Sequence, residues 1–283
     1  MLMSQGCIDC LRRSFTKKKE NVAFIHEVEE LLKNRNDSSA PEIVYYYNQI
    51  HKKYYGEMDN QKFISIKSRF NQLVLSMEIE IQKKIDESSD PLFTSLLLAR
   101  IGNYIDFEAM EKVDSEQFIQ LLFHFEASTH DVETYQSFVE KCSKAEKFLI
   151  VVDNCGEIVL DKLFVIELKK KFPQLKITAM VRGGLVSNDA TLEDAKESGL
   201  DKVCEIVTNG MAVAGTVYRL LGENEQRIID EADVIVSKGQ ANYESLSGGQ
   251  FHIFYSFLCK CEMFSKRFNV PPLTGMFVEE CAR

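Results

Sequence analysis

The stretch that decides the fold is Lys147-Phe148-Leu149-Ile150-Val151-Val152-Asp153-Asn154-Cys155-Gly156-Glu157-Ile158-Val159. Its five consecutive apolar residues, 148–152, are typical of a strand buried on both faces in a parallel sheet. Ligands bind beyond the carboxyl ends of such strands, where Asp153, Asn154 and Glu157 follow. Gly156 permits a tight turn, and the helix after it would direct backbone N–H groups at the same place. These residues indicate a site for a divalent cation and an anionic substrate, or else an N-cap on an ordinary turn.

A second strand end carries similar residues. The apolar run 175–181 is followed by Asn188 and Asp189, just before a predicted helix. Neighbouring strand ends of a doubly wound sheet lie side by side, so Asp153, Asn154 and Asp189 are predicted to ligate one metal ion. Carboxylate and amide oxygens favour Mg²⁺, Mn²⁺ or a similar ion. Asp189 has the alternative role of a helix N-cap.

A third strand end supplies a cation. Residues 233–237 predict a strand, and Lys238 follows it directly, in front of Gly239. From this position an ammonium group can meet a phosphate, although a solvated surface lysine is the usual alternative. Asn242 is predicted to add an amide to the same anion, and Asn188 a further substrate contact.

These three segments, with two others, resemble the signature motifs of the damage-control phosphatases, a family also described as acidic-residue-methyltransferase-like. The matching segments are Asp153–Glu157, Asn188–Thr191, Lys238–Glu244, Gly102–Phe107 and Cys7-Ile8-Asp9-Cys10, of which the last resembles the CxxC of the prokaryotic-type subfamily. The resemblance runs from about Cys7 to Cys261. It implies a metal-dependent phosphatase of small phosphorylated metabolites, with Asp153, Asn154 and Asp189 on the metal and Lys238 near the phosphate.

The pattern of the chain changes near residue 145. Before it, apolar residues recur at helical spacing, which predicts a long helix over 63–85 and others over 15–32, 92–103, 115–125 and 131–143, with helix starts at Pro41 and Pro91. After it, strands alternate with helices, and 250–261 predicts one more strand. We expect an α/β fold with a doubly wound, mostly parallel sheet. An N-terminal all-helical cap subdomain (1–145) would pack on an α/β metal-binding subdomain (146–283) as one structural unit.

Three cap residues are candidates for substrate contacts. Asn103 and Asp106 lie near a predicted helix end and would reach over the site, with helix capping as the alternative. Arg100, one turn earlier, would bind phosphate or pair with a carboxylate.

The eight cysteines are expected to be thiols in a reducing cytosol. Cys7 and Cys10 form half of a zinc site or a redox pair, with Cys259 and Cys261 as a candidate second half. The remaining cysteines, including Cys281, are most simply small hydrophobic residues. The five histidines show no metal spacing.

Composition limits the class of protein. A formal net charge of -9 disfavours nucleic acid and anionic membranes as partners. No apolar stretch approaches membrane-spanning length, and the N-terminus shows no secretion signal. The chain is therefore expected to be a cytoplasmic enzyme, and its sequence favours no particular oligomeric state.

The predicted reaction is hydrolysis of phosphomonoesters, such as damaged or surplus sugar, nucleotide or cofactor phosphates, with Mn²⁺, Mg²⁺, Co²⁺ or Ni²⁺. A metal-activated water would attack, oriented or deprotonated by Glu157 or Asp153, while Lys238 and the helix start at Gly156 offset the phosphoryl charge. A covalent aspartyl-phosphate on Asp153 is the competing route, but the Asp-x-Asp pattern of such enzymes is absent.

Two other classes of protein remain open. An S-adenosylmethionine-dependent carboxyl methyltransferase would suit the sheet, but the first strand lacks its usual glycine-rich loop. A non-catalytic metal or redox protein would be centred on Cys7 and Cys10.

Overall fold

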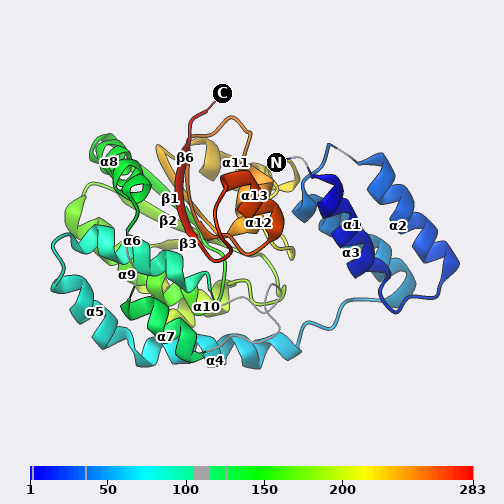
Figure 1. The fold of residues 1–283 in the computed structure, drawn as a ribbon, viewed down its shortest axis with the longest axis horizontal. Helices are drawn as coiled ribbons and strands as arrows, with labels where there is room; N and C mark the ends of the chain where they lie inside the picture. Colours follow the sequence, from blue (N-terminus) through cyan, green and yellow to red (C-terminus); the bar gives the residue numbers. More distant parts are fainter. Residues whose placement is uncertain (2, 36, 105–114, 125–126, 283) are drawn as a thin grey trace.

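The computed structural model describes residues 1, 3–35, 37–104, 115–124 and 127–282. Its centre is a six-stranded sheet in the order β3-β2-β1-β4-β5-β6 (Figure 1). The strands are β1 (Lys147–Val151), β2 (Lys176–Val181), β3 (Glu205–Thr208), β4 (Val234–Lys238), β5 (Ile253–Leu258) and β6 (Gly275–Glu280). β1 to β5 pair in parallel, whereas β6 is antiparallel to β5. The predicted α/β fold with a mostly parallel sheet is confirmed.

The central strand is buried on both faces, as its apolar run predicts. Phe148 and Ile150 belong to one hydrophobic cluster, and Leu149 and Val151 belong to another on the opposite face. Because successive side chains of a strand point to opposite faces, this alternation places core on both sides of the sheet. The strand order turns back between β1 and β4, so the loops that follow these two strands open a crevice at the switch point.

Helices cover the two faces unequally. The helices are α1 (Gln5–Thr16), α2 (Val22–Asn34), α3 (Ala40–Tyr55), α4 (Lys62–Ser76), α5 (Glu78–Asp86), α6 (Pro91–Gly102), α7 (Ser115–Phe123), α8 (Thr129–Lys144), α9 (Glu157–Lys171), α10 (Leu192–Ser198), α11 (Glu223–Asp230), α12 (Gln240–Leu246) and α13 (Glu262–Phe268). α4 to α9 pack into the first cluster, and α11 to α13 pack into the second. Within the described residues, none of these helices combines the length and the apolarity needed to cross a bilayer.

The helices before β1 fall into two groups. α1, α2 and α3 share a hydrophobic cluster of their own, which includes Phe24, Val28 and Ile43, and they lie at one end of the molecule (Figure 1). α4 to α8 contribute to the same core as the sheet. The division of the chain near residue 145 stays a prediction.

Two predicted helices are wrong in extent. The helix predicted over 15–32 is instead two helices, α1 and α2, separated by residues 17–21, where Lys18 has a φ of 59°. The helix predicted over 63–85 is divided at Met77 into α4 and α5. The helix starts at Pro41 and Pro91 and the strand within 250–261 are confirmed.

Candidate active site at the strand ends

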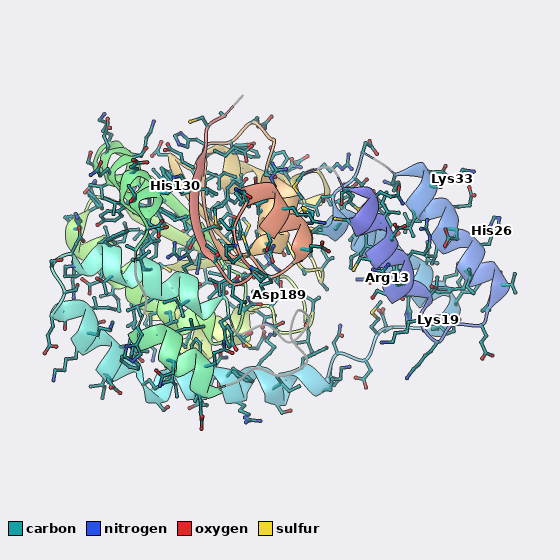
Figure 2. The ribbon with its side chains drawn as sticks, viewed as in Figure 1. Arg13, Lys19, His26, Lys33, His130 and Asp189 are labelled. Atoms are coloured by element: carbon teal, nitrogen blue, oxygen red, sulfur yellow. The ribbon has the colours of Figure 1, made fainter. Side chains whose placement is uncertain are left out.

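The loops after β1 and β2 are joined at the rim of the sheet. Asn154 and Asp189 form an isolated antiparallel bridge. The amide of Cys155 donates to Asn188 O at 2.8 Å, and that of Ala190 donates to Asp153 O at 2.7 Å. The side chains of the two loops are also hydrogen-bonded, because Asn188 Nδ2 donates to Asn154 Oδ1 at 2.7 Å. The structure therefore brings together the predicted metal ligands Asp153, Asn154 and Asp189. Figure 2 shows Asp189 near the middle of the molecule.

Arg182, at the end of β2, lies between the two aspartates. Its Nη2 donates to Asp153 Oδ1 at 3.0 Å and its Nε to Asp189 Oδ2 at 2.5 Å, and its side chain is fully buried. Its Nη1 donates to Asn242 Oδ1 at 3.1 Å. Arg182 was not among the site residues predicted from the sequence. The signal was nevertheless present, because Arg182 follows an apolar strand directly, as Lys238 does.

Lys238 faces protein carboxylates rather than open space. Its Nζ donates to Glu157 Oε1 at 2.7 Å, to Asp161 Oδ1 at 2.6 Å and to Ala99 O at 3.0 Å. These three bonds use all the protons of the ammonium group in this arrangement. The direct contact of Lys238 with phosphate stays a prediction. Burial and the charge of Glu157 raise the pKa of Asp161 to about 7, although Lys238 opposes them.

Asn103 lies over the site, at the end of α6. Its Nδ2 donates both to Asp153 Oδ2 at 3.0 Å and to Glu157 Oε2 at 3.1 Å, and its Oδ1 accepts from the amide of Leu258. Asn154 Nδ2 donates to the same two oxygens at 2.9 and 3.0 Å. Asp153 Oδ2 and Glu157 Oε2 therefore share two amide donors and lie close together. Asp106 lies outside the described residues.

Two further predicted substrate contacts are already engaged within the protein. Arg100 Nη1 pairs with Asp131 Oδ1 at 2.5 Å, and both side chains are buried. Arg100 thus takes the carboxylate-pairing alternative. Asn242 Nδ2 donates to Val152 O and Lys238 O, while its Oδ1 accepts from Arg182. Asn242 therefore holds the loops together in this arrangement.

Two glycines permit the close approach of these segments. A Cβ on Gly239 would lie 1.9 Å from Asp153 Oδ2, and its φ of 78° is strained for other residues. Gly156 has a φ of 70° and caps α9, as the predicted tight turn requires. The amide of Gly156 donates to Asn71 Oδ1 of α4 at 2.7 Å.

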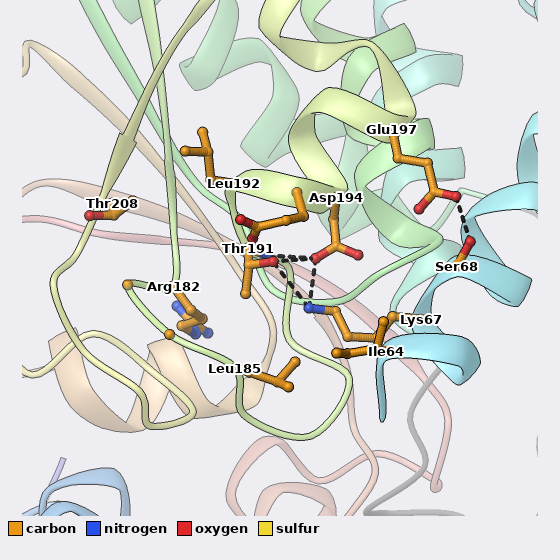
Figure 3. Close-up of a pocket in the computed structure, with 13 residues that line it drawn as sticks. Ile64, Lys67, Ser68, Arg182, Leu185, Thr191, Leu192, Asp194, Glu197 and Thr208 are labelled. Carbon is orange, nitrogen blue, oxygen red and sulfur yellow. Dashed lines mark hydrogen bonds and ion pairs between the residues drawn. The ribbon is translucent and has the colours of Figure 1, made fainter. Parts of the chain in front are cut away.

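Asn71 connects the two ligand-bearing loops. Its Nδ2 donates to Asp194 Oδ1 at 2.9 Å and to Glu197 Oε2 at 2.7 Å, both on α10. Asp194 also forms a capping box with Thr191 and an ion pair with Lys67, which Figure 3 shows. A cavity of about 480 Å³ beside the site is lined by Lys67, Thr191, Asp194 and Arg182, among others. α4 therefore fixes both loops from one side.

The charge balance fits a divalent cation. The site holds four buried carboxylates and two buried cations, namely Asp153, Glu157, Asp161, Asp189, Arg182 and Lys238. Burial and the charges of Asp189 and Glu157 raise the pKa of Asp153 well above its usual value. A divalent cation would offset this excess of negative charge, and two carboxylates with an amide oxygen are the ligands that Mg²⁺ or Mn²⁺ prefers.

Cys155 supplies a backbone amide to this site, but no cysteine thiol is among the hydrogen-bonding groups described for it. Cys7 and Cys10 lie on α1, which begins after its N-cap Ser4, and Cys7 is partly buried. Within the described residues, no third His, Cys, Asp or Glu joins these two cysteines in a cluster that would hold a metal ion. Burial and the charge of Asp194 raise the pKa of the Cys155 thiol, so Cys155 is a poor nucleophile.

The fold and the strand-end residues define the class as an α/β protein with an acidic, oxygen-rich site at the switch point of its sheet. The model of the damage-control phosphatase ARMT1-like domain matches residues 2–272, and the chain belongs to this family.

Two relatives agree with this assignment, and a solved structure shares the fold. A protein of Archaeoglobus fulgidus named damage-control phosphatase is 31% identical over 249 residues, which cover 86% of this chain and 85% of that protein. A damage-control phosphatase of Pyrococcus horikoshii is 27% identical, with 88% and 85% covered. The crystal structure of a DUF89 family protein from Pyrococcus horikoshii has a similar fold, with a TM-score of 0.75, 22% identity, and coverage of 100% of this chain and 99% of that chain.

Proposed function

We propose that this protein is a metal-dependent phosphatase that hydrolyses phosphomonoesters of small metabolites. The observation that carries the proposal is the bridge between Asn154 and Asp189, which gathers the carboxylates of Asp153 and Asp189 around Arg182. Membership of the family and the names of the two relatives support the same reaction.

Asp153, Asn154 and Asp189 would hold the metal ion. Such an ion supplies Lewis acidity, which polarises a phosphoryl group and makes water more acidic. The oxygens Asp153 Oδ2 and Glu157 Oε2, which share the amides of Asn103 and Asn154, are the groups that we propose orient the attacking water. Lys238 would act as a positioning residue, because it holds Glu157 and Asp161 and does not face open space.

We propose a single displacement by water. Both oxygens of Asp153 already accept hydrogen bonds, from Arg182 on one side and from two amides on the other. The residue two positions after Asp153 is Cys155, so the Asp-x-Asp pattern of enzymes that form an aspartyl-phosphate is absent, which favours a ligand role for Asp153 over that of a nucleophile. Single displacement inverts the configuration at a chiral phosphate, whereas an aspartyl-phosphate intermediate gives retention, so the stereochemical outcome of one turnover distinguishes the two routes.

The proposal is tested with a panel of phosphomonoesters, assayed with Mg²⁺, Mn²⁺, Co²⁺ and Ni²⁺. Asp153→Ala and Asp189→Ala should lower kcat/KM by at least about 100-fold, because each removes a proposed ligand. Asp201→Ala, which removes an exposed carboxylate, is the matched control and should leave turnover unchanged. Equal weak turnover in all four proteins would overturn the phosphatase assignment.

A further inference from the structure

Three metal-ligating side chains that the proposed function does not use meet at the outer edge of the sheet. β5 and β6 are antiparallel, with Ile253 opposite Glu280, so His252 lies opposite Cys281. Glu279 is two residues before Cys281 and therefore points to the same face. The ligand atoms of His252, Glu279 and Cys281 all lie within 4.8 Å of one another. Within the described residues this is the one cluster of three His, Cys, Asp or Glu side chains with such spacing.

We propose that His252, Glu279 and Cys281 form a second metal site, which takes a borderline transition-metal ion such as Zn²⁺. An imidazole nitrogen, a thiolate and a carboxylate are the three ligand types that Zn²⁺ accepts in proteins. The set leaves a fourth position of a tetrahedron for solvent. Sequence spacing gives no indication of this site, because 27 residues separate His252 from Glu279 and only strand pairing brings them together.

Metal binding at this site requires little rearrangement of the three side chains. His252 Nε2 and Glu279 Oε1 are 2.6 Å apart, whereas ligands around a tetrahedral zinc ion are separated by roughly 3.3–3.7 Å. The two side chains are 25% and 22% exposed and Cys281 is exposed, so the ligands have room to move apart by about an ångström. The imidazole ring stacks on Phe254 with ring centroids 5.4 Å apart, which fixes the plane of the ring.

The two sites would select different ions. The strand-end site offers oxygen ligands alone and suits Mg²⁺, while the edge site includes a thiolate and disfavours it. An ion at the edge site would also link the residues that flank β5 and β6. β6 is the antiparallel strand at the edge of the sheet, and an ion that binds only the folded protein would stabilise the native state by RT ln(1 + [metal]/Kd).

The test is a titration of the metal-free, reduced protein with Co²⁺. Excess Mg²⁺ is present throughout, because Mg²⁺ fills sites that offer only oxygen ligands. Cobalt bound to a thiolate gives a sulfur-to-metal charge-transfer absorption, and Zn²⁺ should displace it. We expect one equivalent of Co²⁺ with this absorption in the wild-type chain, and none in Cys281→Ser. His252→Ala should weaken Co²⁺ binding by at least about 10-fold. Cys281 is exposed, so its replacement by serine should leave the fold intact.

A double variant, Cys7→Ser with Cys10→Ser, is the matched control and should keep the absorption. Zn²⁺ should also raise the Tm of the wild-type protein but not that of Cys281→Ser. An absorption that persists in Cys281→Ser, one that vanishes in the double variant, or none in the wild-type chain would overturn the proposal. Asp153→Ala should keep the cobalt absorption, so this result does not depend on whether the phosphatase proposal holds.

Discussion

Arg182 has a geometry that another cation cannot reproduce. Its guanidinium donates from two different nitrogens to Asp153 and Asp189, and it is fully buried. Arg182→Lys keeps the charge but replaces the planar guanidinium with a compact ammonium group, which cannot span both carboxylates. We expect kcat/KM for the best phosphomonoester to fall by roughly 10- to 100-fold, with a weaker apparent affinity for Mn²⁺. Steady-state kinetics across a Mn²⁺ titration measures both effects.

The control for this substitution is Arg227→Lys, because Arg227 is exposed and bonds to Asn224. It should leave both parameters unchanged. Wild-type kinetics in Arg182→Lys would show that the guanidinium is not needed to align the two aspartates.

Single residues differ in how far the sequence predicts their surroundings. Asp153 and Asp189 were found because each follows a buried strand, and parallel strand ends meet at one rim. The surroundings of Lys238 were not predictable in the same way. Its partner Asp161 lies one turn after Glu157 on α9, and nothing in the sequence shows which face of that helix turns toward β4. The catalytic and binding roles of these residues stay predictions.

At the scale of elements, α4 acts on the site through Asn71. This side chain is fully buried and holds the amide of Gly156 on one side and Asp194 and Glu197 on the other. Asn71→Ala would leave a buried N–H without its acceptor, which costs about 1–3 kcal/mol. We expect a lower Tm and a Mn²⁺ affinity reduced by about 10-fold, measured by thermal melting and calorimetry.

Gln72→Ala is the matched control, since Gln72 donates to the same Glu197 from the exposed side. It should change neither quantity by a measurable amount. If Asn71→Ala lowered the Tm without any effect on Mn²⁺ affinity, α4 would support the fold but not the position of the ligand loops.

Elements were predicted best where the hydrophobic pattern ends sharply. The strands are bounded by polar loops, and Pro41 and Pro91 mark helix starts. The break at Met77 was missed because apolar spacing continues across it, with Val74 and Ile81 both in the core. Periodicity reports which residues are buried, but it does not report whether the helix axis is continuous.

At the scale of the whole molecule, the sequence indicates helices before residue 145 but not how they group. No proline- or glycine-rich linker separates α3 from α4, yet α1 to α3 share one core and α4 to α8 join the core of the sheet. An amphipathic pattern shows that a helix has a buried face, whereas the partner that covers this face depends on contacts distant in sequence. The grouping therefore required the three-dimensional structure.

α3 packs against α12, and the partly buried carboxyl group of Glu244 on α12 should make stability depend on pH. The amino group of Met1 donates to Glu244 O and Ser247 O. Burial raises the pKa of Glu244 from 4.5 to about 7, although the amino group opposes this shift. The folded state therefore favours the neutral acid, and the stability that this group contributes below pH 4.5 is lost as the pH rises through 7.

Glu244→Gln keeps a neutral side chain at every pH, so it should raise the Tm at pH 8 and have little effect at pH 5. The expected gain at pH 8 is about 2 kcal/mol, or several degrees, because water at the partly exposed side chain reduces the full effect of the shift. Thermal melts of the wild-type and variant proteins at both pH values measure the difference. Glu223→Gln, on the exposed start of α11, should give the same small change at pH 5 and pH 8. A Glu244→Gln effect that is equal at the two pH values would mean that Glu244 is ionised in the folded protein throughout this range.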